Sequence, residues 1–230
     1  MKSLHLFSLL FFTTLLTTFS QAQSIDDRPV LEEFISTQKA AAAPDASYAG
    51  SPYADPIFQK GNVFKNGKLL ASNVGLRYNA LRDEMELKQI NSSDMQTKVL
   101  VRAEDIYVRI GNDTFVFLPN TGEDNIGGYF MVLHEGSKMN VYKKLKKEFI
   151  EGKKSINTMT RDVPPSYKDD EVLFVSYADG SLEEVPGSRN KKLSLFNSGK
   201  KELKQHIRDN RLNINKEYNF LKLVKHYNEL

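Results

Sequence analysis

The sequence has 230 residues and no cysteine. That absence excludes disulfide bonds, thiol catalysis and cysteine-ligated zinc. It also excludes a lipid-anchored lipoprotein, because the anchor requires a cysteine directly after the signal segment. Histidine is scarce as well, and only His134, His206 and His226 lie beyond the first 22 residues. A chain of this length without crosslinks must be stabilised by an ordinary hydrophobic core.

Several common catalytic motifs are missing. His134-Glu135 begins a HExxH zinc motif, but Lys138 occupies the place of the second histidine. The sequence has no GxSxG nucleophile elbow, no P-loop and no GxGxxG motif. A Ser–His–Asp site stays open because its members can lie far apart, and His134 would be its base. His206 and His226 lie among lysines and are expected at the surface. We therefore assign no catalytic residue, no cofactor and no metal.

The N-terminus has the pattern of a secretory signal peptide. Lys2 precedes the apolar run Leu4–Phe19, and Ser20 and Ala22 place small residues at positions −3 and −1 of a cleavage site. A membrane anchor is the alternative, but a bilayer span needs about 20 apolar residues and threonines interrupt this run. We predict that residues 1–22 are a signal peptide and that no membrane span remains after cleavage. The expected destination is the periplasm, with the cell surface or the medium as alternatives.

Residues 23–57 are predicted to form a leader or linker arm, because prolines and small residues are frequent there. Within this arm, Arg28–Lys39 has an apolar stripe that fits a short helix. Two interpretations are open for the remainder. It is either a flexible leader, or a segment that Tyr48, Tyr53 and Phe58 dock onto the sheet.

Residues 58–188 have the pattern of an antiparallel β domain, with short segments of alternating apolar and polar residues between turns. Asn66-Gly67 and Asp179-Gly180 are strong hairpin signals, because these residues tolerate positive φ. Consecutive strands with short links should pair antiparallel. We predict a mainly β (α+β) fold, an antiparallel meander curled into a sandwich or open barrel. Ser155–Asp170 contains two prolines and is expected to be a surface loop.

The stretch from Val74 to Lys88 (VGLRYNALRDEMELK) is central to this pattern. Its apolar side chains alternate with polar ones on both sides of a polar turn. Period-2 alternation predicts one face toward the core and one face in solvent. The expected inward side chains are Leu76, Tyr78, Met85 and Leu87.

Residues 189–230 are predicted to form a basic pair of short helices packed on the β domain. Asn197 or Ser198 can cap a helix that ends near Asp209, and Asn215 can cap a second one. The segment contains 11 Lys/Arg and 4 Asp/Glu residues, a net charge of +7 against +3 for the whole chain. Such asymmetry is typical of an interaction segment.

Four segments together resemble an uncharacterised family of exported, signal-peptide-bearing β-rich proteins of Gram-negative bacteria. They are the Asn66-Gly67 turn with LRYNALRDEMELK (76–88), GGYFMVLHEG (127–136), VYKKL (141–145) and LVKHYNEL (223–230). The resemblance covers Tyr53–Leu230. It implies export and a β-rich fold. The family has no assigned catalytic residues, so the resemblance transfers no function.

A carboxylate cluster is the first candidate site. Glu84 and Glu86 share one face of a predicted strand, and Asp83 precedes them in the turn. Such a pair could act in glycoside hydrolysis or bind a cation. The alternative is a solvated face whose carboxylates pair with basic side chains of the same hairpin, namely Arg77, Arg82 and Lys88.

The loop Asn120–Asn125 (NTGEDN) offers oxygen ligands that suit Ca²⁺. It lacks both the spacing of an EF-hand and the bidentate glutamate of that motif. We therefore expect no calcium site in this loop.

Two groups of lysines are the other candidates. They could attract anionic lipid headgroups or glycans, although charge runs are usually solvated faces. Nucleic acid is not expected, since no aromatic stacking motif accompanies them. The first group is Lys143, Lys144, Lys146 and Lys147, and the second is Lys191, Lys192, Lys200, Lys201 and Lys204. The resulting candidate interaction surface comprises Arg77, Asn79, Arg82, Asp83, Glu84, Glu86, Lys143, Lys144, Lys146 and Lys147.

Three functions are consistent with these patterns. The leading hypothesis is a non-enzymatic cell-envelope protein that binds or assembles with a partner, either another envelope protein or an anionic surface. The second is a periplasmic carrier of an apolar ligand or lipid, held inside a curled sheet rich in apolar strands. The third is a carboxylate-dependent hydrolase. The sequence does not define an oligomeric state.

Overall fold

The computed structural model describes residues 31–230 except 41, 43–44, 46, 89–95, 120–125, 157–158 and 160. The predicted signal peptide and the Asn120–Asn125 loop therefore lie outside the described residues. The strands are β1 Gln59–Lys65, β2 Lys68–Asn79, β3 Glu84–Lys88, β4 Lys98–Val99, β5 Ile106–Ile110, β6 Asp113–Leu118, β7 Gly128–His134, β8 Met139–Ile150, β9 Ser166–Tyr177 and β10 Leu182–Glu184. The helices are a 3₁₀ helix, η1 Leu31–Phe34, and α1 Arg189–Ser194, α2 Lys200–Asp209 and α3 Glu217–Glu229.

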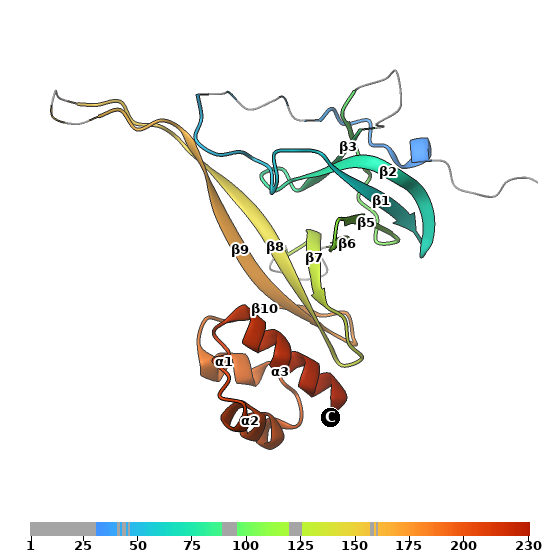
Figure 1. Cartoon of the computed structure of the whole chain (residues 1–230), viewed down its shortest axis with the longest axis vertical. Coiled ribbons are helices and arrows are strands. Elements are labelled where there is room, and N and C mark those ends of the chain that lie inside the picture. Colours follow the sequence, from blue (N-terminus) through green and yellow to red (C-terminus); the bar gives the residue numbers. More distant parts are fainter. Residues whose placement is uncertain are drawn as a thin grey trace, which may run out of the picture.

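All ten strands belong to one antiparallel sheet in the order β10-β9-β8-β7-β6-β5-β1-β2-β3-β4. The prediction of a mainly β antiparallel fold followed by C-terminal helices is confirmed, and the sheet does not close. The order departs from a simple meander at one place. Strand β5 pairs with β1, with Asn62 opposite Arg109, and not with β4. Figure 1 shows β1–β6 at one end of the molecule and the helices at the other.

The two predicted hairpin turns are confirmed. Asn66 and Gly67, between β1 and β2, have φ values of 49° and 74°. Gly180, between β9 and β10, has φ of 81°. These positive values explain the residue choice, because most other side chains would be strained there.

Two hydrophobic clusters lie on different parts of the sheet. The first is built on β1–β3, β5 and β6, and it buries the predicted inward side chains Leu76, Tyr78, Met85 and Leu87. The second lies between the helices and the β8–β9 surface, where Met139, Val141 and Val175 meet Phe220, Val224 and Tyr227. The predicted pair of C-terminal helices is present as α2 and α3, and α1 was not predicted.

The side chain of Asn228 fixes α3 to the turn between β7 and β8. Its Oδ1 accepts hydrogen bonds from the backbone N–H groups of Lys138, at 2.8 Å, and Met139, at 3.0 Å. Its Nδ2 donates to the carbonyl of Met139 at 2.9 Å. One amide thereby satisfies three backbone groups of a turn that would otherwise lack partners.

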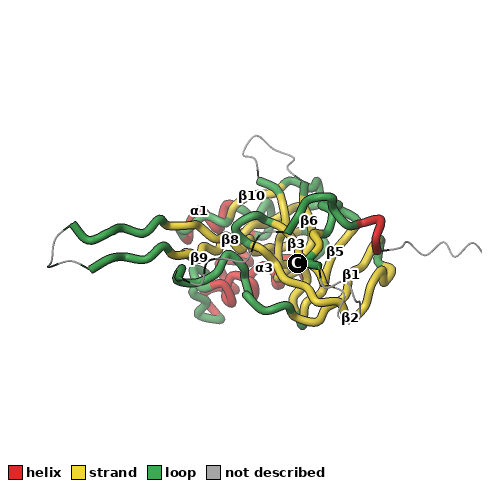
Figure 2. Tube along the Cα trace, turned by 90° about the horizontal axis from the view of Figure 1, so that it is seen from above, coloured by secondary structure: helices red, strands yellow, loops and turns green. Residues whose placement is uncertain are grey.

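The longest pairing in the sheet is the β8–β9 hairpin, which runs from Met139 opposite Tyr177 to Ile150 opposite Ser166. Figures 1 and 2 both show its far end projecting from the rest of the molecule. The prediction of a surface loop over Ser155–Asp170 is wrong for its second part, because Ser166–Asp170 belongs to β9. Pro164 and Pro165 precede this strand, where the missing backbone N–H removes no hydrogen bond from the sheet.

Candidate functional site

The charged face of the β2–β3 hairpin is not in solvent. Asn79 and Glu86 are fully buried and Glu84 is only 2% exposed. The expectation of a solvated outer face is therefore wrong for these residues. The cause is the segment before β1, because Tyr53 is 2% exposed and Ala54 donates its N–H to the carbonyl of Tyr78 at 3.0 Å. Both faces of this hairpin are thus covered.

Arg77 is the cation beneath this cover. Its Nη2 donates to Oε2 of Glu86 at 2.6 Å, and its guanidinium lies 3.5 Å from the ring centre of Tyr53 and 4.2 Å from that of Phe58. Stacking between two aromatic rings suits the planar guanidinium. Burial, followed by the carboxylate of Glu86, raises the pKa of the Tyr53 phenol. Of the two interpretations of the N-terminal arm, docking by Tyr53 and Phe58 is the one that the structure shows.

Glu84 is the second buried carboxylate. Its Oε1 accepts from Nε2 of Gln38 at 2.6 Å and pairs with Nη2 of Arg82 at 3.2 Å. Its Oε2 is buried without a hydrogen-bond partner among the described residues. Each of the two strand carboxylates therefore has its own arginine. Such pairing gives both carboxylates a structural role within the hairpin.

Asp83 links the β2–β3 turn to the middle of the sheet. Oδ1 of Asp83 accepts from the Tyr78 hydroxyl of β2 at 2.6 Å, the Tyr129 N–H of β7 at 3.0 Å and Nζ of Lys144 of β8 at 2.8 Å. Lys144 is buried, and desolvation lowers the pKa of its ammonium group even though Asp83 opposes the shift. Burial and the charge of Asp83 raise the pKa of the Tyr78 phenol.

The four lysines of the predicted basic group on β8 point alternately to opposite faces. Lys143 pairs with Glu217 of α3 at 2.8 Å and with Glu171 at 3.3 Å. Lys144 pairs with Asp83, and Lys147 pairs with Asp169. The group is therefore not one cationic surface, because carboxylates neutralise three of its members. The remaining lysine, Lys146, is exposed.

The tip of the β8–β9 hairpin, defined here as residues 149–167, carries the most exposed apolar side chains of the described chain. Ile156 is 95% exposed and Met159 is 94% exposed. Val163, Ile150 and Phe149 are also exposed. A soluble domain normally buries such side chains, and a group of them at the end of a projection marks an interaction site.

The N-terminal arm supports the root of this tip. Ala49 accepts from the Tyr167 N–H and donates to the Pro165 carbonyl, both at 2.9 Å. The ring of Tyr48 lies 5.4 Å from that of Phe149, which lies 5.3 Å from that of Tyr167. Tyr48 is thus the third docking residue of the arm. The same arm covers the β2–β3 hairpin and holds the β8–β9 hairpin in place.

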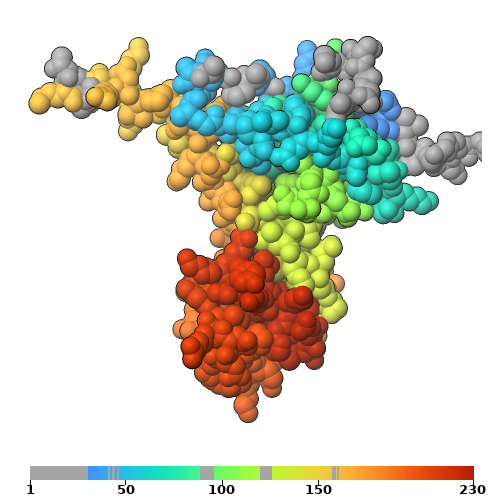
Figure 3. Space-filling view, viewed as in Figure 1, coloured from blue at the N-terminus to red at the C-terminus, as the bar shows by residue number. Residues whose placement is uncertain are grey.

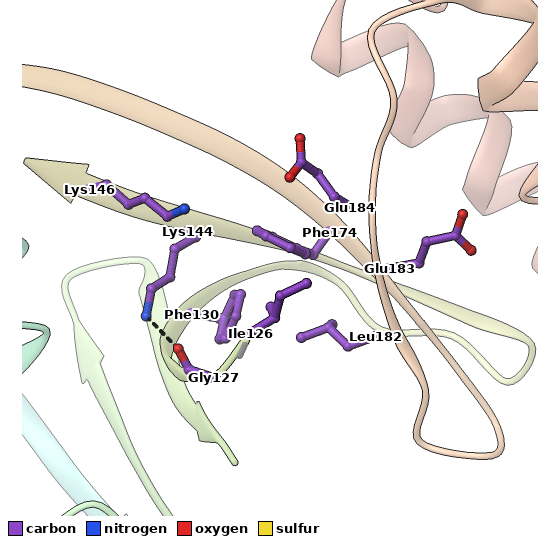
Figure 4. A pocket seen from close by; sticks show the side chains of 9 residues that line it. All are labelled: Ile126, Gly127, Phe130, Lys144, Lys146, Phe174, Leu182, Glu183 and Glu184. Atoms are coloured by element: carbon purple, nitrogen blue, oxygen red, sulfur yellow. Dashed lines mark hydrogen bonds between the residues drawn. The ribbon is translucent and has the colours of Figure 1, made fainter. Parts of the chain in front are cut away.

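A cavity with a volume of about 510 Å³ lies over β7–β10. Figure 4 shows its lining side chains, with Phe130 and Phe174 at the floor and charged side chains around them. The complete lining is Ile126, Gly127, Phe130, Lys144, Lys146, Phe174, Leu182, Glu183 and Glu184. The sequence alone did not indicate this cavity, because its lining residues come from strands that are far apart in the chain.

The histidines do not form a site with the carboxylates. His206 and His226 stack with their ring centres 3.9 Å apart, while Nε2 of His134 lies 3.2 Å from Nδ2 of Asn228. Burial, together with the neighbouring His226, lowers the pKa of His206. Among the described residues there is no group of three or more His, Cys, Asp or Glu that could hold a metal ion. No helix in that part of the chain is long and apolar enough to cross a membrane.

Comparisons with known proteins add no assignment. Neither the protein-family models, nor the curated proteins, nor the solved structures contain a match to this chain. The resemblance to an exported family of Gram-negative bacteria therefore stays a prediction.

Proposed function

We propose that this protein is an exported, non-enzymatic cell-envelope protein that binds a partner protein through the tip of its β8–β9 hairpin. The observation that carries the proposal is the group of exposed apolar side chains at the end of an anchored projection. Ile156 and Val163 there are large enough to act as anchors in an apolar cleft of a partner.

The charges around the tip indicate the character of that cleft. Lys153, Lys154 and Arg161 are basic, against Glu151 and Asp162. An apolar cleft with a mildly acidic rim would complement this arrangement. The N-terminal arm holds the root of the tip in place before a partner binds. Binding therefore costs less conformational entropy. The space-filling view in Figure 3 shows how far the tip stands from the remaining surface, which leaves room for a partner around it.

Site-specific cross-linking tests this function. A photoreactive residue at position 156, introduced into the full chain in its native cells, should give one discrete protein adduct. A photoreactive residue at Leu69, which is 56% exposed on the β1–β2 hairpin, is the matched control and should give none. Equal labelling from both positions would contradict the proposal, and so would labelling of lipid alone from position 156.

The affinity for the isolated partner then measures how much each tip residue contributes to binding. Ile156→Asp should weaken binding at least tenfold, because a charge would enter an apolar cleft. Leu69→Asp, a change of the same kind at the other end of the molecule, should leave binding unchanged. Export itself is checked by sequencing the N-terminus of the mature protein, which we expect to begin at Gln23.

The other two hypotheses receive different support. Of the carboxylates proposed for a hydrolase, Glu84 and Glu86 are buried and paired with arginines, and Asp83 is paired with Lys144. Their geometry therefore favours a structural role. A carrier of lipid would need an enclosed apolar cavity. The cavity over β7–β10 combines an apolar floor with charged walls, which points to a ligand of another chemical class.

A further inference from the structure

The cavity over β7–β10 lies on the face of the sheet opposite to the helices. Met139, Val141 and Val175 point to the helices, while Tyr142 and Phe174 on the same strands point to the other side. Phe174 and its neighbour Phe130 on this second face line the cavity. It is separate from the hairpin tip, so an inference about it does not depend on the proposed function.

The floor of the cavity is aromatic. The rings of Phe130 and Phe174 are 5.4 Å apart and nearly perpendicular, at 85°. Both side chains are buried, and the partly buried Ile126 and Leu182 pack against them at the rim. Such a floor binds an apolar side chain or a short alkyl group.

One wall of the cavity is cationic. The ammonium group of Lys144 donates to Asp83 at 2.8 Å and to the Gly127 carbonyl at 3.1 Å. A lysine has three such N–H groups, so one remains for a ligand. Lys146 lies close enough to contribute to the lowered pKa of Lys144. Asp83 balances only one of these two positive charges, and the surplus favours a carboxylate.

The opposite wall is anionic. Glu184 pairs across the strands with Phe174. In Figure 4 its carboxylate and the ammonium group of Lys146 point toward the space above Phe174, while the carboxylate of Glu183 points away. Within the described part of the chain, neither Lys146 nor Glu184 forms an ion pair. Two unpaired charges of opposite sign thus lie on either side of an apolar floor.

We infer that this cavity binds a small zwitterion with an apolar side chain, namely an apolar amino acid or short peptide. Its carboxylate is bound by Lys146 and the remaining N–H of Lys144, its ammonium group by Glu184, and its side chain by Phe130 and Phe174. The volume of about 510 Å³ is within the range of small-molecule sites.

Titration calorimetry of the mature chain with leucine and with the dipeptide leucyl-leucine tests this inference. At least one of the two should bind with saturation. The N-acetylated and C-amidated forms of that ligand should each bind about tenfold more weakly, because each lacks one charge-assisted contact. No saturable binding up to millimolar ligand, or equal binding of the blocked forms, would overturn the inference.

Neighbouring residues supply matched variants. Lys146→Ala and Glu184→Gln should each weaken binding about tenfold. Lys147→Ala is the control for the first, because Lys147 faces the other side of β8 and pairs with Asp169. Glu183→Gln is the control for the second. Glu183 lines the edge of the cavity, but its carboxylate points away from it in Figure 4 and accepts from the Tyr177 hydroxyl at 3.2 Å. Losses as large in the controls as in the site variants would refute the assignment.

Amide NMR locates the ligand independently of affinity. Saturating ligand should shift the signals of Gly127, Phe130 and Phe174. Shifts confined to another part of the molecule, such as the cavity lined by His206, Lys222 and His226, would place the ligand elsewhere and exclude the inferred site.

Discussion

The β2–β3 and β8–β9 hairpins share a pattern of apolar and charged residues but have opposite surroundings. Both alternate apolar with charged residues, and both contain cross-strand pairs of opposite charge, Arg77 with Glu86 and Lys147 with Asp169. In the first hairpin the Glu86 side chain is 0% exposed, whereas Asp169 in the second is 77% exposed. Alternation defines two faces of a strand, and it does not say what lies on the second face.

The N-terminal arm makes the difference. It crosses the β2–β3 hairpin with Tyr53 and Phe58, whereas the contacts of its described residues with the β8–β9 hairpin lie near the tip, around Phe149 and Tyr167. One hairpin therefore becomes an interior element with charged side chains, and the other stays a projection. This contrast leads to predictions that differ in magnitude for chemically similar substitutions.

The largest effect is expected for Arg77→Ala. The substitution would leave the Glu86 carboxylate buried without its cation, and breaking a buried pair in this way costs about 3–5 kcal/mol. The measurement is the free energy of unfolding in urea. Lys147→Ala leaves behind the Asp169 carboxylate, which is 77% exposed and stays in contact with water, so it should cost less than about 1 kcal/mol.

Equal effects of the two substitutions would show that the surroundings of the hairpins do not differ. The double variant Arg77→Met with Glu86→Met separates the loss of the ion pair from the cost of leaving a buried charge unpaired. It removes both charges and should regain much of the stability that Arg77→Ala loses, because no unpaired charge remains.

The second prediction concerns the cover itself. Tyr53→Ala should destabilise the protein by about 3 kcal/mol, since it empties the site of a buried aromatic ring. It should also increase hydrogen exchange at the backbone amides of the β2–β3 hairpin more than at those of β8 and β9. Uniform acceleration across the sheet would mean that the arm does not act locally.

The third prediction uses pH. Tyr78 has a raised pKa in the folded protein, so it stays protonated above pH 10, where the unfolded chain ionises. Its contribution to stability is fully present below pH 10 and is lost as the pH rises further. Tyr78→Phe should therefore cost about 1 kcal/mol at neutral pH, for its bond to Asp83, and should reduce the loss of stability above pH 10. Parallel pH profiles for the two proteins would contradict this.

Local signals in the sequence were sufficient for much of the fold. The Asn66-Gly67 turn and the inward side chains Leu76 and Met85 follow from residue type and period-2 alternation, and both are confirmed. The helices α2 and α3 follow from their apolar stripes in the same way. Each of these features depends on residues close together in the chain.

The features that were missed depend on distant contacts. Burial of Glu84 and Glu86 needs the arm around Tyr53, about 30 residues earlier, and the pairing of β5 with β1 bypasses three intervening strands. The cavity combines Lys144 and Lys146 of β8 with Glu184 of β10. Docking of the arm onto the sheet by Tyr48, Tyr53 and Phe58 was one of two interpretations of the sequence, but nothing in the sequence specifies which strands they contact.

The smallest effect on stability is expected at the hairpin tip. Ile156→Asp should change the free energy of unfolding by less than about 0.5 kcal/mol, because its side chain is 95% exposed and contributes little to a core. The same substitution should abolish partner binding if the tip is the interface. A residue that matters for binding and not for folding is the opposite of Arg77, which matters for folding through its pair with the buried Glu86. A large loss of stability from Ile156→Asp would place the tip inside the fold and remove the contrast between the two hairpins.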